Sequence, residues 1–104
     1  MQGISVVVPV FNEEGNVREL HKEILEVCKK ENYKFEIIFV DDGSKDKTPE
    51  ICKELKPLKY IRMRKNFGQT AAMDAGIKLA QYDYIVTMDG DRQNDPADIP
   101  KLVN

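Results

Sequence analysis

Cysteine is scarce in this sequence, which contains only Cys28 and Cys52. No CxxC pair and no pair of histidines accompanies them, so neither a disulfide framework nor a zinc site is expected. Both cysteines fall on segments predicted to be helical, and free thiols of this kind are typically buried. We therefore expect reduced, packed cysteines in a cytoplasmic protein.

Long apolar runs and an excess of positive charge are also missing. The longest apolar stretch, residues 6–10, has about five residues, whereas a membrane-spanning helix needs about 20. No charged region followed by an apolar stretch opens the chain, so no secretory signal is expected. Sixteen Lys or Arg against 18 Asp or Glu give a net charge of −2. General nucleic-acid binding needs a basic surface and is not expected.

The composition is typical of one small folded domain. Apolar residues make up 41% of the 104 residues and charged residues 33%, a balance that excludes a disordered chain. The length suffices for one domain with its own core, and we expect residues 1–104 to form that single domain.

Strands and helices are predicted to alternate along the chain. Asn16 with Glu19 resembles a capping box at the start of the first helix, and Asp95 or Asp98 caps the last one. The predicted strands are 4–10, 35–40, 59–63 and 84–88, and the predicted helices before the last one are 16–31, 48–55 and 68–80. This order predicts an α/β fold, a three-layer, Rossmann-like arrangement with a mostly parallel sheet between helices.

Polar residues follow all four predicted strands. In parallel sheets of this kind, ligands bind beyond the carboxyl ends of the strands, where the strand order reverses. Carboxylates occur after three of the four strands, and like charges at one edge need a cation or a hydrogen-bond donor to offset them. The four segments to consider are 9–14, 41–44, 64–68 and 89–93.

Asp89, Gly90 and Asp91 come directly after the fourth strand. Two carboxylates around a residue without a side chain can direct two hard oxygen ligands at one point, and Gln93 adds a neutral oxygen. Mg²⁺ or Mn²⁺ prefers such ligands and completes its shell with phosphate and water. The sequence therefore predicts a divalent metal site at Asp89, Asp91 and Gln93.

The other strand ends leave alternatives open. Asp41 and Asp42 follow the second strand, where a carboxylate can accept hydrogen bonds from a ribose or a base. Phe11 either stacks on a base or covers the sheet edge. Glu13 and Glu14 either take part in a site or only complement the dipole of the first helix.

Further polar residues receive mainly structural interpretations. Ser44, Asp46 and Thr48 are expected to cap the following helix. Arg64 and Lys65 either belong to a solvated strand face or face a diphosphate. His21 lies on the first predicted helix, away from every strand end, so no catalytic role is expected for it.

Two other protein classes lack their signatures here. A dinucleotide-binding dehydrogenase needs GxGxxG after the first strand, where Gly15 is the only glycine. A phospho-receiver domain needs an acidic pair at that position, where Asn12 and Glu13 stand instead.

Four segments together resemble the N-terminal part of a family 2 glycosyltransferase with the GT-A fold. They are VVVPVFNEEGNV (6–17), IIFVDDGSKDKT (37–48), RKNFGQTAAMDAGI (64–77) and MDGDRQNDPADIPKL (88–102). Within that family the chain is similar to the dolichol-phosphate-mannose-synthase-like branch, which includes bacterial enzymes that glycosylate undecaprenyl phosphate.

The resemblance implies roles for particular residues. Asp41, with Asp42 beside it, matches the carboxylate that contacts the base or ribose, and Asp91 matches the metal ligand of the DxD motif. Arg92 departs from the apolar residue common at this position in the branch. The implied metal ligands are Asp89, Asp91 and Gln93, and the implied nucleotide-binding residues are Pro9, Phe11, Glu13, Asp41, Asp42, Gly68, Asp89 and Gly90.

The implied reaction is transfer of a sugar, with inversion, from a nucleotide-diphosphate sugar to a polyprenyl phosphate. A UDP-sugar is the first expectation for the donor and a GDP-sugar the second. Mg²⁺ or Mn²⁺ would stabilise the leaving diphosphate. The implied place of the full-length enzyme is the cytoplasmic face of the membrane.

Members of this family are much longer than this chain, so we expect a C-terminally truncated fragment. The acceptor site and any catalytic base are then expected beyond Asn104, and the isolated chain is expected to be inactive. The truncated sheet edge favours a homodimer. The alternative is a non-catalytic nucleotide-binding module.

Overall fold

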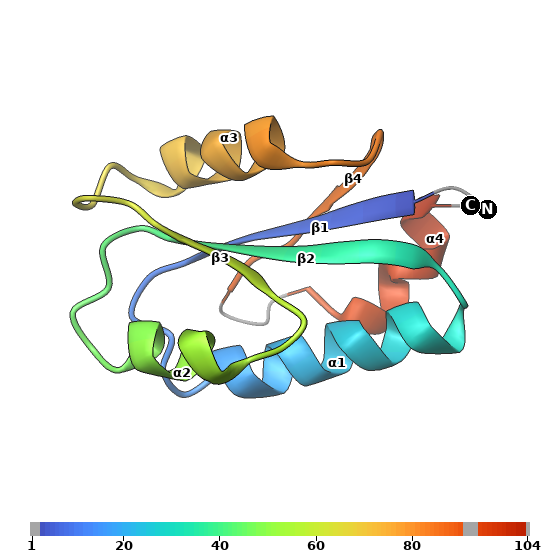
Figure 1. Ribbon diagram of the computed structural model, residues 1–104, viewed down its shortest axis with the longest axis horizontal. Helices are drawn as coiled ribbons and strands as arrows, with labels where there is room; N and C mark the ends of the chain where they lie inside the picture. Colours follow the sequence, from blue (N-terminus) through green and yellow to red (C-terminus); the bar gives the residue numbers. More distant parts are fainter. Residues whose placement is uncertain (1–2, 91–93, 104) are drawn as a thin grey trace.

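The computed structural model describes residues 3–90 and 94–103 (Figure 1). The predicted strands and the first three helices are confirmed, each end differing by one residue at most. The strands are β1 (Gly3–Val10), β2 (Lys34–Asp41), β3 (Lys59–Arg62) and β4 (Tyr84–Thr87). The helices are α1 (Val17–Lys30), α2 (Thr48–Glu54), α3 (Gln69–Leu79), the short 3-10 helix η1 (Pro96–Asp98) and α4 (Ile99–Val103).

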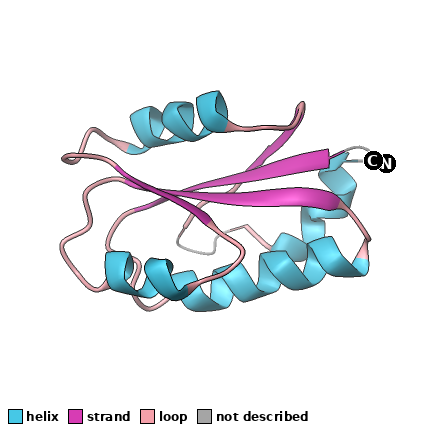
Figure 2. Ribbon diagram, in the orientation of Figure 1, coloured by secondary structure: helices cyan, strands magenta, loops and turns pink. Residues whose placement is uncertain are grey.

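All pairings in the four-stranded sheet are parallel, and the strand order is β3-β2-β1-β4. Helix α3 covers one face of the sheet, while α1, α2 and α4 lie on the other (Figure 2). This confirms the predicted three-layer α/β fold. The chain builds outward from β1 to β3 and then returns to place β4 on the other side of β1. The strand order therefore reverses between β1 and β4, the place where such sheets bind ligands.

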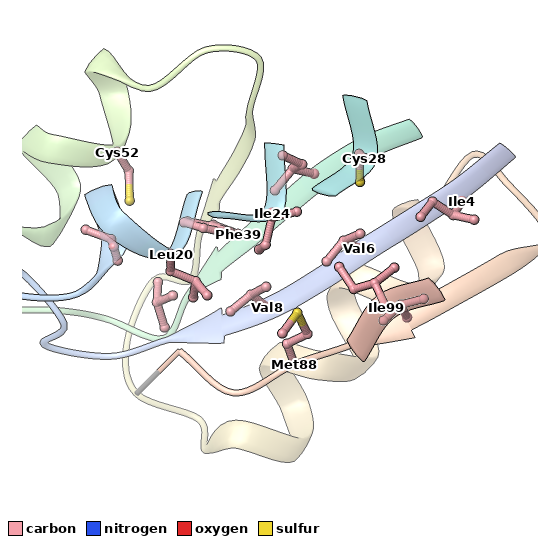
Figure 3. Packing of buried hydrophobic residues seen from close by; sticks show 14 residues of the cluster. Ile4, Val6, Val8, Leu20, Ile24, Cys28, Phe39, Cys52, Met88 and Ile99 are labelled. Carbon is pink, nitrogen blue, oxygen red and sulfur yellow. The ribbon is translucent and has the colours of Figure 1, made fainter. Parts of the chain in front are cut away.

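The core consists of two apolar layers, one on each face of the sheet. Val6 and Val8 of β1 pack with Leu20 and Ile24 of α1 on one face (Figure 3). The alternate residues Val7, Ile38 and Val40 pack with Ala72 of α3 on the other face. The continuous β-branched run of β1 is thus explained, because this strand is buried on both sides.

Both cysteines and the histidine are part of this packing. Cys28 and Cys52 are free and buried, and burial raises the pKa of their thiols to about 11 and about 12. His21 is buried, its ring edge lies against Phe39, and its Nε2 lies 2.8 Å from the Pro57 carbonyl oxygen. The buried, free cysteines confirm the packed thiols expected from the sequence, and the absence of a catalytic role for His21 stays a prediction.

Two local expectations are settled by the helix ends. The predicted capping box is wrong, because the Asn16 side chain donates to Glu13 Oε1 at 2.8 Å and does not cap α1. Asp95, not Asp98, caps the last helical segment, since its Oδ1 accepts from the Ala97 N–H at 3.0 Å. Among residues 3–90 and 94–103, no helix has both the length and the apolar character needed to cross a bilayer.

Helix α3 approaches the sheet closely at Gly76. A Cβ atom at this position would lie 2.4 Å from Val7 Cγ1 and 2.9 Å from Val40 Cγ2. The two valine side chains are stiff at χ1 and cannot turn away freely. Glycine is therefore required by space, although it is a poor helix former.

We expect Gly76→Ala to destabilise the fold by about 1–3 kcal/mol through overpacking, despite the better helix propensity of alanine. Gly15→Ala is the matched control, because nothing lies within 4 Å of a Cβ atom there. Urea unfolding of both variants measures the difference. Equal stability of Gly76→Ala and the wild type would contradict this packing.

Glu36 joins three parts of the sheet near its amino-terminal edge. Its carboxylate accepts from Ser5 Oγ at 2.7 Å, the Gln81 N–H at 2.6 Å and Lys59 Nζ at 2.9 Å. Burial alone would raise the pKa of Glu36, but these hydrogen bonds hold it below its ordinary value of 4.5. The network thus favours the charged carboxylate.

The stabilisation by Glu36 should be present above pH 4.5 and should be lost as the pH falls through the lower folded-state pKa. This sign follows because the unfolded chain takes up the proton more readily. Glu36→Gln should therefore reduce the free energy of unfolding at pH 7 and reduce it less at pH 3. Urea titrations at both pH values, with exposed Glu26→Gln as the control, test this. A loss of equal size at both pH values would rule out the carboxylate as its source.

Candidate functional site

A cleft of about 460 Å³ lies where the carboxyl ends of all four strands meet. It is bounded by the loop after β1, by Asp42 after β2, by the start of α3 and by the segment after β4. It brings together seven of the eight predicted nucleotide-binding residues. The residues that line it are Pro9, Val10, Phe11, Glu13, Asp42, Asn66, Gly68, Gln69, Asp89 and Gly90.

The loop after β1 is shaped by Asn12. This residue has φ 52°, a left-handed conformation that asparagine adopts more readily than most residues. Its N–H donates to Ser44 Oγ at 2.8 Å, and its Oδ1 accepts from the Lys45 N–H at 2.8 Å. The turn that ends β1 is therefore bonded in both directions to the turn that ends β2.

Two further side chains from the second loop hold the first. Glu13 N–H donates to Thr48 Oγ1 at 2.9 Å, and Glu14 N–H donates to Asp46 Oδ2 at 3.1 Å. Burial opposes ionisation of Asp46, yet hydrogen bonds from Thr48 and Glu14 keep its pKa below the ordinary value. We call this set of contacts between residues 12–14 and 44–48 the loop clasp.

The loop clasp corrects part of the expected helix capping. The α2 helix has no side-chain cap at its N-cap residue Lys47, although Asp46 Oδ1 does accept from the Thr48 N–H at 2.9 Å. Ser44 and Thr48 instead use their hydroxyl groups on the neighbouring loop. The capping predicted for Ser44 and Thr48 is therefore wrong, because the backbone N–H groups that their hydroxyls accept from belong to the loop after β1.

Asp41 and Asp42 point to opposite faces of the sheet, as successive strand residues do. The Asp41 carboxylate is fully buried and accepts from the Ser44 N–H at 2.7 Å and from Tyr60 Oη at 2.6 Å. Burial, followed by this hydrogen bond to Asp41, raises the pKa of Tyr60. Asp41 does not line the cleft, so the structure does not support the nucleotide contact expected for it.

Asp42 lines the cleft and also anchors its floor. Its Oδ1 accepts from the Phe67 N–H at 2.8 Å and its Oδ2 from the Gly68 N–H at 2.9 Å. Gly68 has φ 101°, a left-handed conformation that glycine adopts without steric cost. This bend lets two consecutive amides face the same carboxylate just before α3 begins.

Asp89 forms the opposite wall of the cleft. Its Oδ1 accepts from Gln69 Nε2 at 2.9 Å, and its N–H donates to Asn94 Oδ1 at 2.8 Å. Next to it, Gly90 lies against β1, since a Cβ atom there would be 2.8 Å from the Pro9 carbonyl oxygen. A side chain at position 90 would therefore push the segment after β4 away from the cleft.

The predicted metal ligands are only partly visible. Asp89 offers a carboxylate on the cleft wall, and only its Oδ1 is hydrogen bonded within the described part of the chain. Asp91 and Gln93, like Arg92, lie outside the described residues. Within residues 3–90 and 94–103, no group of three His, Cys, Asp or Glu side chains is placed to hold a metal ion. The Asp89 carboxylate is a hard oxygen donor of the kind that Mg²⁺ and Mn²⁺ prefer, and its role as a metal ligand stays a prediction.

The basic residues after β3 lie beside a second cleft of about 630 Å³. Arg64 and Lys65 line it with Lys45 and Arg62, and Arg62 Nη2 donates to the Ser44 carbonyl oxygen at 2.9 Å. Phe11 borders both clefts. Arg64 and Lys65 thus do not line the cleft that contains Asp89, where a diphosphate contact had been one of the two interpretations.

Residues 5–104 match the sequence profile of Glycosyl transferase family 2, and the chain belongs to this family. It is 44% identical over 106 residues to the dodecaprenyl-phosphate galacturonate synthase of Rhizobium johnstonii, covering 97% of this chain and 31% of that protein. It is 39% identical to an undecaprenyl-phosphate 4-deoxy-4-formamido-L-arabinose transferase of Pseudomonas savastanoi pv. phaseolicola, with 96% and 31% covered. The chain thus spans about a third of the length of these relatives.

Solved glycosyltransferase structures show the same fold. The Staphylococcus aureus protein TarS 1–349 in complex with UDP has a TM-score of 0.70 at 28% identity, over 88% of this chain and 28% of that chain. A mannosyltransferase from Pyrobaculum calidifontis, in complex with GDP-Man and Mn²⁺, has a TM-score of 0.67 at 27% identity, over 85% and 27%. These likenesses confirm the expected GT-A fold.

Three residues of the cleft were missed by sequence reasoning: Val10, Asn66 and Gln69. Val10 reads as a core residue, and its side chain is indeed buried. Asn66 belongs to the polar segment 64–68 after the third strand, in which the sequence indicates roles only for Arg64, Lys65 and Gly68. Gln69 opens a predicted helix, and nothing in its sequence surroundings indicates that its side chain reaches the segment after β4.

Removal of one hydroxyl from the loop clasp should weaken the fold without changing its shape. Thr48→Val leaves the Glu13 N–H without its acceptor, and we expect a loss of about 1–3 kcal/mol in unfolding free energy. Exposed Thr87→Val is the matched control. Hydrogen exchange should show faster exchange at the Glu13 amide in Thr48→Val, and unchanged protection there would contradict the contact.

Proposed function

We propose that this chain is the donor-binding part of an inverting glycosyltransferase that transfers a sugar from a nucleotide-diphosphate sugar to a polyprenyl phosphate. One observation carries the proposal: in a family 2 chain, the carboxylates Asp42 and Asp89 face one cleft at the switch point of the sheet. The names of the relatives support the acceptor class, and the UDP and GDP-Man complexes of the structural neighbours support the donor class.

The nucleoside is assigned to the side of the cleft next to Asp42. Phe11 offers an aromatic face there that is 41% exposed, and each Asp42 oxygen keeps a lone pair beyond its one hydrogen bond to the 67–68 amides. Asp42, not Asp41, is thus our assignment for the hydrogen bond to the base or ribose. Pro9, Glu13 and Gly68 complete this part of the wall.

The diphosphate is assigned to the side next to Asp89 and Gly90. The described walls carry the carboxylates Glu13, Asp42 and Asp89 and no lysine or arginine, so a diphosphate needs a cation between itself and these side chains. Asp89, with Asp91 and Gln93 outside the described residues, would hold Mg²⁺ or Mn²⁺. The bound cation would stabilise the negative charge on the leaving diphosphate.

The acceptor phosphate needs no strong base, because its oxygen is already anionic. That oxygen would attack the anomeric carbon opposite the diphosphate, so that the bond to the diphosphate breaks as the new bond forms. We place the acceptor site beyond Asn104 and the full-length enzyme at the cytoplasmic face of the membrane. Polyprenyl phosphates in the names of the relatives support a place of the full-length enzyme at a membrane. A homodimer through the truncated edge of the sheet stays a prediction.

A non-catalytic nucleotide-binding module is the second candidate. Incubation of the full-length protein with a UDP-sugar or a GDP-sugar, Mn²⁺ and a polyprenyl phosphate separates the two. Sugar transfer would exclude the module, whereas nucleotide binding without any transfer would favour it.

Calorimetric titration with UDP and with GDP, each with and without Mn²⁺, tests donor binding. We expect one of the two nucleotides to bind more tightly with Mn²⁺, and Asp91→Ala to remove the gain that Mn²⁺ provides. Asp83→Ala, at the opposite edge of the sheet, is the control. A chain that unfolds cooperatively but binds neither nucleotide would contradict the proposal, and an Asp91→Ala variant with the full Mn²⁺ gain would remove the metal role from Asp91.

A further inference from the structure

Within residues 3–90 and 94–103, Gln69 is a polar side chain that joins α3 to the segment after β4. Its Nε2 lies 2.9 Å from Asp89 Oδ1, and both residues line the cleft. The family resemblance places this glutamine, as a neighbour of Gly68, in the loop that packs under the nucleotide, and it assigns the side chain no contact of its own. We propose that Gln69 is a positioning residue that holds the Asp89 carboxylate toward the bound nucleotide. This inference rests on the proposed function.

The segment 67–69 reaches both acidic walls of the cleft. Its first two residues donate backbone N–H groups to Asp42, at 2.8 and 2.9 Å. Its third residue, Gln69, donates a side-chain N–H to Asp89. The segment 67–69 thus contacts both Asp42, which we assign to the nucleoside, and Asp89, which we assign to the diphosphate.

The segment itself is held firmly at its helical end. Helix α3 starts at Gln69 and lies directly on β1 and β2, where Gly76 allows contact with Val7 and Val40. The position of the Gln69 backbone is therefore set by the sheet. Only the side-chain amide extends from this fixed point to Asp89.

Among residues 3–90 and 94–103, the hydrogen bond from Gln69 is the contact that reaches the Asp89 carboxylate. The Asn94 contact fixes the Asp89 backbone N–H, and the close fit of Gly90 fixes the chain next to it. Neither contact reaches the carboxylate. A donor placed on one carboxylate oxygen selects one rotamer and leaves the other oxygen for a ligand, which lowers the entropy lost on binding.

Gln69→Met tests the proposal, because methionine keeps the length of the side chain and lacks the N–H donor. We expect the dissociation constant for the nucleotide in the presence of Mn²⁺ to rise about threefold to tenfold, the range of one hydrogen bond to a charged acceptor that is partly exposed. The melting temperature should stay within about a degree of the wild type. Gln81→Met, at the opposite edge of the sheet, should change neither quantity.

A double-mutant cycle separates positioning from a direct contact. If Gln69 acts through Asp89, Gln69→Met should have no further effect on affinity in an Asp89→Ala background, which lacks an acceptor for the Gln69 N–H. Equal loss in both backgrounds would overturn the proposal in favour of a direct contact between Gln69 and the nucleotide. A wild-type affinity in Gln69→Met, together with weakened binding in Asp89→Ala, would also overturn it.

The outcomes distinguish this proposal from the proposed function. If the wild-type chain binds neither UDP nor GDP with Mn²⁺, the proposed function fails, and the positioning role fails with it. If the wild type binds a nucleotide and Gln69→Met binds it with the same affinity, the positioning role alone fails. A readout without ligand is the NMR signal of the Gln69 side-chain amide, which should shift in Asp89→Ala, because alanine offers no acceptor. An unchanged signal would show that the hydrogen bond is not formed in solution.

Discussion

The loop clasp is the interaction on which the rest of the site depends. Neither the loop after β1 nor the loop after β2 has regular structure of its own, yet both supply walls of the cleft. The side-chain oxygens of Ser44, Asp46 and Thr48 accept hydrogen bonds from three consecutive backbone N–H groups of the first loop. Buried or half-buried amides need such partners. The clasp therefore makes two loops behave as one rigid wall.

The remaining walls are fixed by close approach of backbone to backbone. Gly90 lies against the end of β1, and Gly76 brings α3 onto the sheet. Asp42 then ties the residues before α3 to the end of β2. Each wall is thus positioned by a neighbour that is itself part of the core, which is the condition for a pre-formed binding site.

Hydrophobic patterning predicted the fold well because the central strands β1 and β2 contain the apolar runs 6–10 and 37–40. The alternation of residues along β2 also bears on Asp41 and Asp42. Phe39 belongs to the apolar layer under α1 and Val40 to the layer under α3, so strand alternation places Asp41 on the first side and Asp42 on the second. Asp42, two residues after Val40, therefore falls on the α3 side of the sheet, where the cleft lies.

Other parts of the site have no such signal. Ser44 and Thr48 occur where capping residues are common, and local preference cannot reveal a hydrogen bond to a residue more than 30 positions away. The contact of Gln69 is equally hidden from the sequence, because its partner Asp89 is brought close only by the pairing of β4 with β1. Tertiary contacts of single polar side chains are the part that sequence reading could not supply.

The central place of β1 has a consequence for the order in which the cleft can assemble. β1 pairs early in the chain with β2, where Ile4 faces Phe35, and only much later with β4, where Ile4 faces Tyr84. Pairings between distant residues are slow to form. During synthesis the nucleoside wall can take shape while the segment carrying Asp89 is still inside the ribosome. Nucleotide binding by a partly synthesised chain would therefore show that β4 has already paired with β1.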